Sequence, residues 1–190
     1  AQQLYGKELS YNNIIDLNAA LELVKEFERP SAIVIKHTNP CGAASADTLA
    51  EAFTKAYAGD PVSAFGCILG LNKTVDVATA EAITEPGHFV EAIIAPEYEK
   101  EAVEILTTKR KWGSGIRLLK TGALSAKLID PCAYDMKRVV GGMLLQGRDL
   151  SVYDAANLKI VTKKKPSEKE MADLRFAFIV CKHVKSNSIV

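Results

Sequence analysis

The sequence lacks the features that mark membrane-bound, secreted or nucleic-acid-binding proteins. Its 24 basic and 23 acidic residues leave a net charge of +1, so it has no basic excess with which to bind nucleic acid. No apolar run approaches the ~20 residues of a membrane-spanning helix, and no secretory signal opens the chain. We therefore expect a cytoplasmic protein that binds neither nucleic acid nor a membrane.

Cysteine is sparse as well. The four cysteines, Cys41, Cys67, Cys132 and Cys181, stand too far apart for any pair to have the close spacing of zinc ligands. Four thiols in 190 residues are also too few for a disulfide-stapled secreted module. We expect reduced thiols and no metal site.

What the chain does contain is an ordinary globular composition, 48% apolar and 25% charged. Its length is sufficient for a sizeable core and favours one domain, or one and a fraction. The first residue is Ala1 rather than Met, and residues 187–190 resemble the start of a strand. We therefore expect a fragment of a longer polypeptide.

Short apolar runs alternate with helical patterns over the first 120 residues. The runs predict strands at residues 32–35, 67–71 and 92–95. The patterns predict helices at residues 16–27, 47–58, 77–83 and 97–106. The run at 32–35 is wholly apolar, as in a buried parallel strand. This alternation predicts an α/β fold, layered α/β/α with a mostly parallel sheet.

The second half of the chain has a less regular pattern. Residues 116–119 and 139–145 are strand candidates, and the two adjacent glycines in the second one predict a bulge or a close backbone approach. Ser167 and Glu170 have the spacing of a capping box, and the residues after them have the apolar periodicity of a helix. We expect this last helix to end in a polar loop.

A lysine and a histidine stand side by side where the first predicted strand ends. Lys36 and His37 follow the apolar run, and Asn39 and Pro40 predict a loop. At the carboxyl end of a parallel strand, such side chains face the crevice in which α/β proteins bind ligands. Lys36 would supply a fixed positive charge and His37 a proton acceptor. The alternative is a solvated lysine and a hydrogen-bonded histidine at a strand end.

Two further segments contain candidate binding residues. Gly66 ends the turn at residues 60–66 and would let a ligand approach the backbone, although a glycine before a strand is also ordinary turn chemistry. Asn187 lies in the loop after the last helix and offers both a donor and an acceptor, but the pattern leaves its role open. We interpret Lys182 and His183 as cations that complement the dipole at a helix C-terminus.

Six stretches of the chain carry a resemblance to a known family. They are "GKELSYNNIIDLNAAL", "IKHTNPCGAA", "DPVSAFG", "EAIIAPEYEKEA", "GGMLLQ" and "KHVKSNSIV", in that order, and they span nearly the whole chain. Together they resemble the transformylase region of the bifunctional purine biosynthesis family. That family joins a formyltransferase acting on 5-aminoimidazole-4-carboxamide ribonucleotide (AICAR) to an IMP cyclohydrolase.

The resemblance implies an architecture. Residues 1–190 would be the first of two lobes of the transformylase domain, with a fold similar to that of cytidine deaminase. The cyclohydrolase domain and the second lobe would lie outside this chain. The complete enzyme would be a homodimer whose active site is assembled at the subunit interface.

The resemblance also implies roles for five residues. Lys36 matches the lysine that stabilises the transition state, His37 the histidine that takes or relays the proton, and Asn187 the asparagine that positions substrate and transfer. Gly66 matches a nucleotide-contacting glycine, and Glu91 stands where some members carry a substrate-binding aspartate. The implied reaction transfers the formyl group of 10-formyltetrahydrofolate to the 5-amino group of AICAR, in IMP biosynthesis.

Two other functions remain alternatives. A zinc-dependent deaminase requires H-x-E and P-C-x-x-C, whereas His37 is followed by Asn39 at the glutamate position, and Cys41 and Cys132 each lack the second cysteine. The other alternative is a non-catalytic lobe that serves as a scaffold or dimerises. Because the second lobe is missing, we expect the chain alone to be inactive or nearly so.

Overall fold

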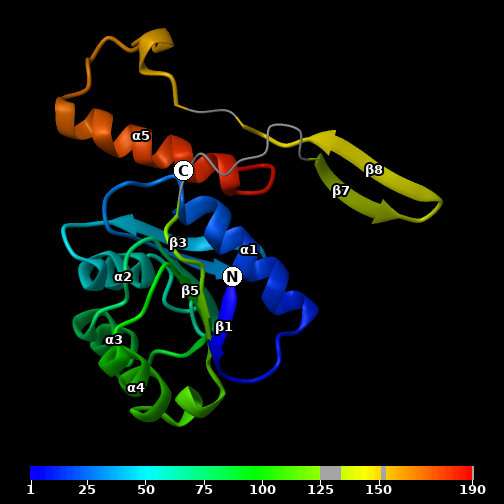
Figure 1. Ribbon diagram of the computed structural model, residues 1–190. Coiled ribbons are helices and arrows are strands. Elements are labelled where there is room, and N and C mark those ends of the chain that lie inside the picture. Colours follow the sequence, from blue (N-terminus) through cyan, green and yellow to red (C-terminus); the bar gives the residue numbers. More distant parts are fainter. Residues whose placement is uncertain (125–133, 151–152, 190) are drawn as a thin grey trace. The chain divides into compact units, whose positions relative to one another are not determined.

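Figure 1 shows the computed structural model of the chain, which describes residues 1–124, 134–150 and 153–189. The chain divides into two compact units, residues 1–124 with 180–190, and residues 125–179. Each unit is considered by itself. Cys132, one of the cysteines weighed as a zinc ligand, lies outside the described residues.

A six-stranded mixed sheet forms the centre of the first unit, with the strand order β1-β6-β5-β4-β2-β3. The strands are β1 (Gln2–Tyr5), β2 (Ser31–Lys36), β3 (Asn39–Ser45), β4 (Cys67–Leu71), β5 (Val90–Ala95) and β6 (Arg117–Lys120). The β4–β5 and β5–β6 ladders are parallel, and the other three are antiparallel. β3, β4, β5 and β6 therefore run in one direction, and β1 and β2 in the other.

Helices cover both faces of this sheet (Figure 1). They are α1 (Tyr11–Val24) on one face, and α2 (Leu49–Ala58), α3 (Val77–Ile83) and α4 (Lys100–Thr108) on the other, with a 3₁₀ turn, η1 (Lys111–Gly115), after α4. Side chains alternate between the faces of a strand. Leu69 and Leu71 accordingly join the core under α2 to α4, while a Cβ on Gly70 would meet the backbone of Ala20 in α1 at 2.7 Å. The predicted α/β/α layering is confirmed.

Helix caps explain where the helices begin. Thr48 accepts a hydrogen bond from the backbone N–H of Glu51 at 3.2 Å, which starts α2 within the predicted helix. α1 begins at Tyr11, five residues before the predicted start, because Ser10 and Asn13 form a reciprocal capping box. An asparagine replaces the usual Glu or Gln in this box, so the pattern does not stand out in the sequence.

The strand that contains Lys36 differs from the prediction. β2 is antiparallel to both of its neighbours, not parallel. The expected loop after it is the strand β3, and His37 and Thr38 alone form the hairpin turn, with φ of 54° and 63°. Positive φ at both central residues is the geometry of a type I′ turn, which usually contains Asn and Gly. Without those residues the hairpin was not recognisable.

The second unit contains a β-hairpin. β7 (Tyr134–Val139) pairs antiparallel with β8 (Gly142–Gly147), so the single strand predicted at 139–145 is wrong. Its two glycines mark the hairpin turn, where Gly141 has a φ of 87°. Every residue of both strands is exposed.

The last long helix is α5 (Glu168–His183), preceded by a 3₁₀ turn, η3 (Ala155–Asn157). The predicted capping box at its start is confirmed, because Ser167 and Glu170 each accept a hydrogen bond from the other's backbone N–H, at 3.3 and 2.7 Å. The final turn of α5 belongs to the first unit. In the described parts of the chain, no helix combines the length and apolar character needed to cross a membrane.

Candidate active site

The predicted catalytic lysine lies at the last position of β2. Lys36 Nζ donates hydrogen bonds to the backbone carbonyls of Phe65, at 2.7 Å, and Gly66, at 3.0 Å. Both carbonyls belong to the turn that leads into β4. Because β2 is antiparallel to β4, its carboxyl end meets the amino ends of β4 and β5. The expectation that Lys36 ends a parallel strand and faces the usual crevice is therefore wrong.

Gly66 is required by the space around it as well as by its backbone. Its φ is +73°, and its N–H donates to the carbonyl of Phe89 at 2.8 Å. A Cβ at this position would lie 3.2 Å from Lys36 Nζ and 3.3 Å from the ring of Phe89. The structure thus brings together two of the predicted site residues, Lys36 and Gly66.

His37 is exposed in the hairpin turn, whereas Lys36 is half-buried. Neither side chain is enclosed in hydrophobic packing. A contact with α1 fixes the hairpin turn, because the N–H of Thr38 donates to Asp16 Oδ1 at 2.7 Å. The backbone around His37 is therefore anchored while its imidazole is open to a ligand.

Glu91 lies in β5 at the same end of the sheet. Its carboxylate accepts a hydrogen bond from the side chain of Asn13 in α1 at 3.5 Å. The nearby thiol of Cys67 is buried, and burial together with the charge of Cys41 raises its pKa to about 12, with Lys36 lowering it and Glu91 raising it slightly.

Asn187 is exposed in the segment after α5. Two residues earlier, the backbone N–H of Lys185 donates to Asn39 Oδ1 at 3.1 Å, and the Lys185 ammonium contacts the hydroxyl of Thr38. The segment at 185–187 therefore lies beside the turn that contains His37. Thr38 and Lys185, which are 147 positions apart in the sequence, meet there.

Lys182 and His183 have a specific partner that sequence reasoning missed. Glu26 Oε1 accepts hydrogen bonds from Lys182 Nζ at 2.9 Å and from His183 Nε2 at 2.5 Å. Burial raises the pKa of the Glu26 carboxyl, but these two hydrogen bonds outweigh it and leave the pKa below its ordinary value. Nothing in the pattern could show this, because Glu26 lies at the other end of the chain.

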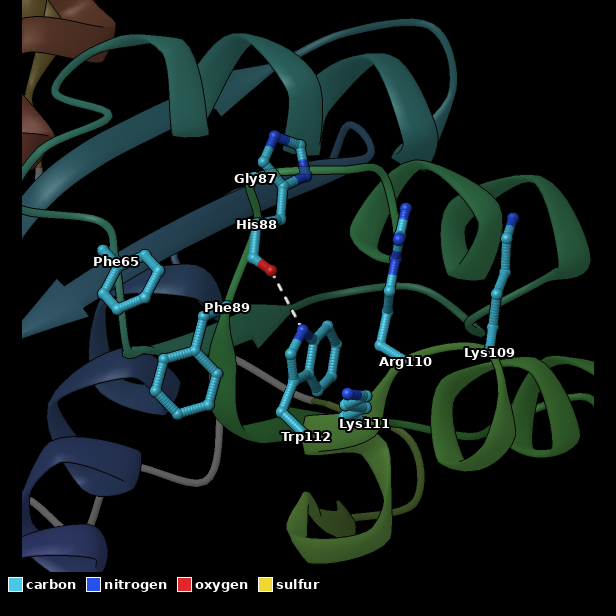
Figure 2. Close-up of a pocket in the computed structure, with 8 residues that line it drawn as sticks. All are labelled: Phe65, Gly87, His88, Phe89, Lys109, Arg110, Lys111 and Trp112. Atoms are coloured by element: carbon cyan, nitrogen blue, oxygen red, sulfur yellow. Dashed lines mark hydrogen bonds between the residues drawn. The ribbon is translucent and has the colours of Figure 1, made fainter.

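A pocket of about 620 Å³ has Phe65, the residue before Gly66, in its lining (Figure 2). Its aromatic lining is formed by Phe65, Phe89 and Trp112. The ring centroids of Phe65 and Phe89 are 5.2 Å apart, and those of Phe89 and Trp112 are 6.2 Å apart. The indole N–H of Trp112 donates to the carbonyl of His88 at 2.9 Å and holds that ring in place. Because Phe65 also accepts from Lys36, the pocket and the lysine share one turn.

Three consecutive basic residues complete the pocket lining, on the side away from Phe65 (Figure 2). Lys109 forms an ion pair with Glu81, and Arg110 Nε donates to the carbonyl of Thr84 at 2.6 Å. Lys111 is exposed. Flat rings stack on aromatic side chains, and guanidinium and ammonium groups bind carboxylates or phosphates. The pocket therefore suits a ligand with a flat ring and an anionic tail.

The family model of the AICARFT/IMPCHase bienzyme matches residues 1–190. The chain belongs to this family. Among its relatives named bifunctional purine biosynthesis protein PurH, that of Thermoanaerobacter sp. (strain X514) is 54% identical over 189 residues. Those of Magnetococcus marinus and Rhodopirellula baltica are 53% and 47% identical over 191 residues. Each alignment covers 100% of this chain but 35% or 36% of the relative, so the chain spans about a third of their length.

Membership of the AICARFT/IMPCHase family confirms the resemblance inferred from the motifs. The roles of individual residues stay predictions. Among the residues that the structure describes, no three His, Cys, Asp or Glu side chains gather as a metal site. Cys41, weighed as a deaminase ligand, instead donates its S–H to the carbonyl of Val34 at 3.6 Å.

Proposed function

We propose that this chain provides the central catalytic residues of an AICAR formyltransferase within a bifunctional enzyme of purine biosynthesis. The reaction transfers the formyl group of 10-formyltetrahydrofolate to the 5-amino group of AICAR and gives formyl-AICAR. The enzyme would act in the cytoplasm. The observation that carries the proposal is the position of Lys36 Nζ, which two backbone carbonyls hold beside Gly66.

Lys36 is suited to stabilise negative charge in the transition state. The 5-amino group of AICAR is a poor nucleophile because its lone pair is delocalised into the carboxamide. Its attack on the formyl carbon creates an oxyanion. An ammonium has three N–H donors, and two of those on Lys36 are used by the carbonyls of Phe65 and Gly66. The third would donate to the oxyanion from a preorganised position.

His37 would accept the proton that the attacking amine loses. A neutral imidazole is a competent base near pH 7. The side chain is exposed, and Asp16 anchors the backbone next to it. The proton would pass from the amine nitrogen to the imidazole as the new carbon–nitrogen bond of AICAR forms. The tetrahedral intermediate would then collapse by breaking the bond between the formyl carbon and N10 of the folate, and the departing nitrogen would take up a proton, so that tetrahydrofolate leaves.

The remaining predicted residues would bind AICAR. Gly66 lets the nucleotide approach the backbone, and the carboxylate of Glu91 would accept from substrate N–H or O–H groups. Asn187 would orient the substrate from the segment beside the hairpin turn. Support for this arrangement comes from the contacts of Lys185 with Thr38 and Asn39.

The aromatic pocket would hold the formyl donor. 10-Formyltetrahydrofolate combines flat ring systems with a glutamate tail, and the pocket combines Phe65, Phe89 and Trp112 with a basic side. Its position next to Lys36 would bring the formyl group to the lysine.

The complete protein would be a homodimer in which residues 1–190 form the first transformylase lobe. We also carry over the likeness to the cytidine deaminase fold as a prediction. One observation favours the alternative role in dimerisation: the β7–β8 hairpin exposes large apolar side chains, namely Tyr134, Met136, Met143, Leu144 and Leu145. Sedimentation of the full-length protein with Leu145→Glu, compared with the unchanged protein, tests whether the hairpin holds subunits together.

The catalytic proposal is tested by turnover of the full-length protein with AICAR and 10-formyltetrahydrofolate. His37→Ala is expected to lower kcat about 10²–10⁴-fold, and Lys36→Ala about 10²–10³-fold. The control is Lys55→Ala, because Lys55 is an exposed lysine of α2. Near-normal rates for both His37→Ala and Lys36→Ala would overturn the proposal. Robust turnover by residues 1–190 alone would overturn the part of it that places the rest of the active site outside this chain.

A further inference from the structure

We infer that Glu26 is a positioning residue that holds the segment at 184–188, and with it Asn187, in register with the hairpin turn of His37. The inference deepens the proposed function, on which it rests for the role of Asn187. Glu26 itself lies in the turn after α1, and its side chain binds Lys182 and His183 rather than His37 or Asn187.

Glu26 is bonded to the end of α5. One carboxylate oxygen accepts from Lys182 at 2.9 Å and from His183 at 2.5 Å. The three side chains are only 14–18% exposed. An exposed ion pair would contribute little, but in this enclosed geometry the loss of Glu26 would remove an acceptor that two side chains of α5 share.

Further contacts hold the residues on both sides of Asn187. Lys185 binds Asn39 and Thr38 at the hairpin turn. Ser188 Oγ lies 3.0 Å from Cys181 Sγ and closes the segment back onto α5. Asn187 therefore has an anchored residue on each side, although it is itself exposed.

Both sets of contacts lead to the same helix. Thr38 at the turn is bound by Asp16 of α1, and His183 is bound by Glu26 just after the end of α1. A single rigid element therefore sets the position of the His37 turn and of the Asn187 segment. Removing Glu26 would release one end of the segment while the turn stays in place.

The main experiment compares Glu26→Ala, which removes the accepting oxygen, with the unchanged full-length protein in the formyl-transfer assay. We expect kcat to fall about 10–100-fold, as for a small misplacement of a reacting group, with the KM for AICAR much less affected. Glu97→Ala is the control, because Glu97 forms an ion pair with Lys120 at the opposite end of β5. Unchanged kcat in Glu26→Ala would overturn the inference.

A double-mutant cycle separates positioning from general destabilisation. If Glu26 acts through Asn187, Glu26→Ala adds no further loss of kcat in an Asn187→Ala background, since the two changes are then coupled. Additive losses would show that Glu26 acts by another route and would overturn the inference.

Hydrogen exchange of residues 184–188 keeps this inference distinguishable from the proposed function. Glu26→Ala is expected to speed exchange there and to leave exchange in β4 and β5 unchanged. Normal activity of Asn187→Ala together with faster exchange in Glu26→Ala would refute the role of Asn187 and leave the holding role of Glu26 standing. If Glu26→Ala does not fold, His183→Leu removes one of the two contacts and keeps Lys182; normal kcat and normal exchange in that variant would equally overturn the inference.

Discussion

At the scale of single residues, the candidate site depends on where one ammonium group is held. Lys36 would be an ordinary surface lysine if the carbonyls of Phe65 and Gly66 did not direct it to the start of β4. Those carbonyls are available because Gly66 adopts a positive φ. The chemistry of the lysine is therefore linked to the conformation of a glycine thirty positions further along the chain.

Gly66→Ala tests this link. The new methyl group would crowd Lys36 Nζ and the Phe89 ring, and positive φ would strain the backbone by about 1–2 kcal/mol. We expect a loss of that size in urea denaturation and a large fall in kcat. Gly122→Ala is the matched control, because Gly122 has a φ of +76° with nothing within 4 Å of the Cβ position. It should lose similar stability and keep its activity; equal activity in both variants would contradict the link.

The types of the site residues could be predicted from sequence, but their contacts could not. Adjacent Lys36 and His37 at the end of an apolar run were visible, and Gly66 was visible as a turn glycine. The contact of Glu26 with His183 depends on residues 157 positions apart, which no local pattern encodes. Glu91 became a candidate only through the family resemblance, and the same resemblance supplied a role for Asn187, which the pattern had left open.

At the scale of elements, local sequence signals predicted the bounds of several helices and strands correctly, but they did not predict how the strands pair. β4 and α3 have the predicted bounds, and α2 starts at its predicted cap. These elements depend on neighbouring residues, through apolar periodicity and capping. The β2–β3 and β7–β8 hairpins were missed because strand pairing is decided by long-range contacts and by turns. As a result, the direction of β2, and hence the end of the sheet where Lys36 lies, was predicted wrongly.

Asp16→Ala tests how α1 supports the hairpin turn. It removes the acceptor of the Thr38 N–H, and an unsatisfied buried donor costs about 1–3 kcal/mol. We expect reduced stability and a lower kcat, since the backbone beside His37 loses its anchor. Asp16→Asn retains the accepting oxygen and should restore most of the rate.

The control for this helix–turn contact is Asp47→Ala. Asp47 forms an exposed ion pair with Arg29, and its side chain is 89% exposed, so its loss should change little. The measurements are the formyl-transfer rates and the urea denaturation midpoints of Asp16→Ala, Asp16→Asn and Asp47→Ala. If Asp16→Ala has the rate of Asp47→Ala, the contact with α1 has no role in placing His37.

At the scale of the whole molecule, the predicted site residues all belong to one unit of the chain. Lys36, Gly66 and Glu91 lie at the amino ends of β4 and β5, and Asn187 lies in the segment that contacts the neighbouring turn. The chain spans about a third of the length of its relatives, so the remaining substrate contacts would come from the rest of the protein. We therefore expect Lys36 and Asn187 of one chain to serve one and the same active site.

Subunit mixing tests that expectation. Full-length Lys36→Ala and Asn187→Ala proteins are unfolded together and refolded, so that mixed dimers form. If one chain supplies both residues to one site, every site in a mixed dimer carries a defect, and no activity returns. If Asn187 instead served the site of the other subunit, some sites would receive both intact residues, and turnover would rise above that of either variant refolded alone. Recovered turnover would therefore show that the contacts of Lys185 with Thr38 and Asn39 within one chain do not define the working site.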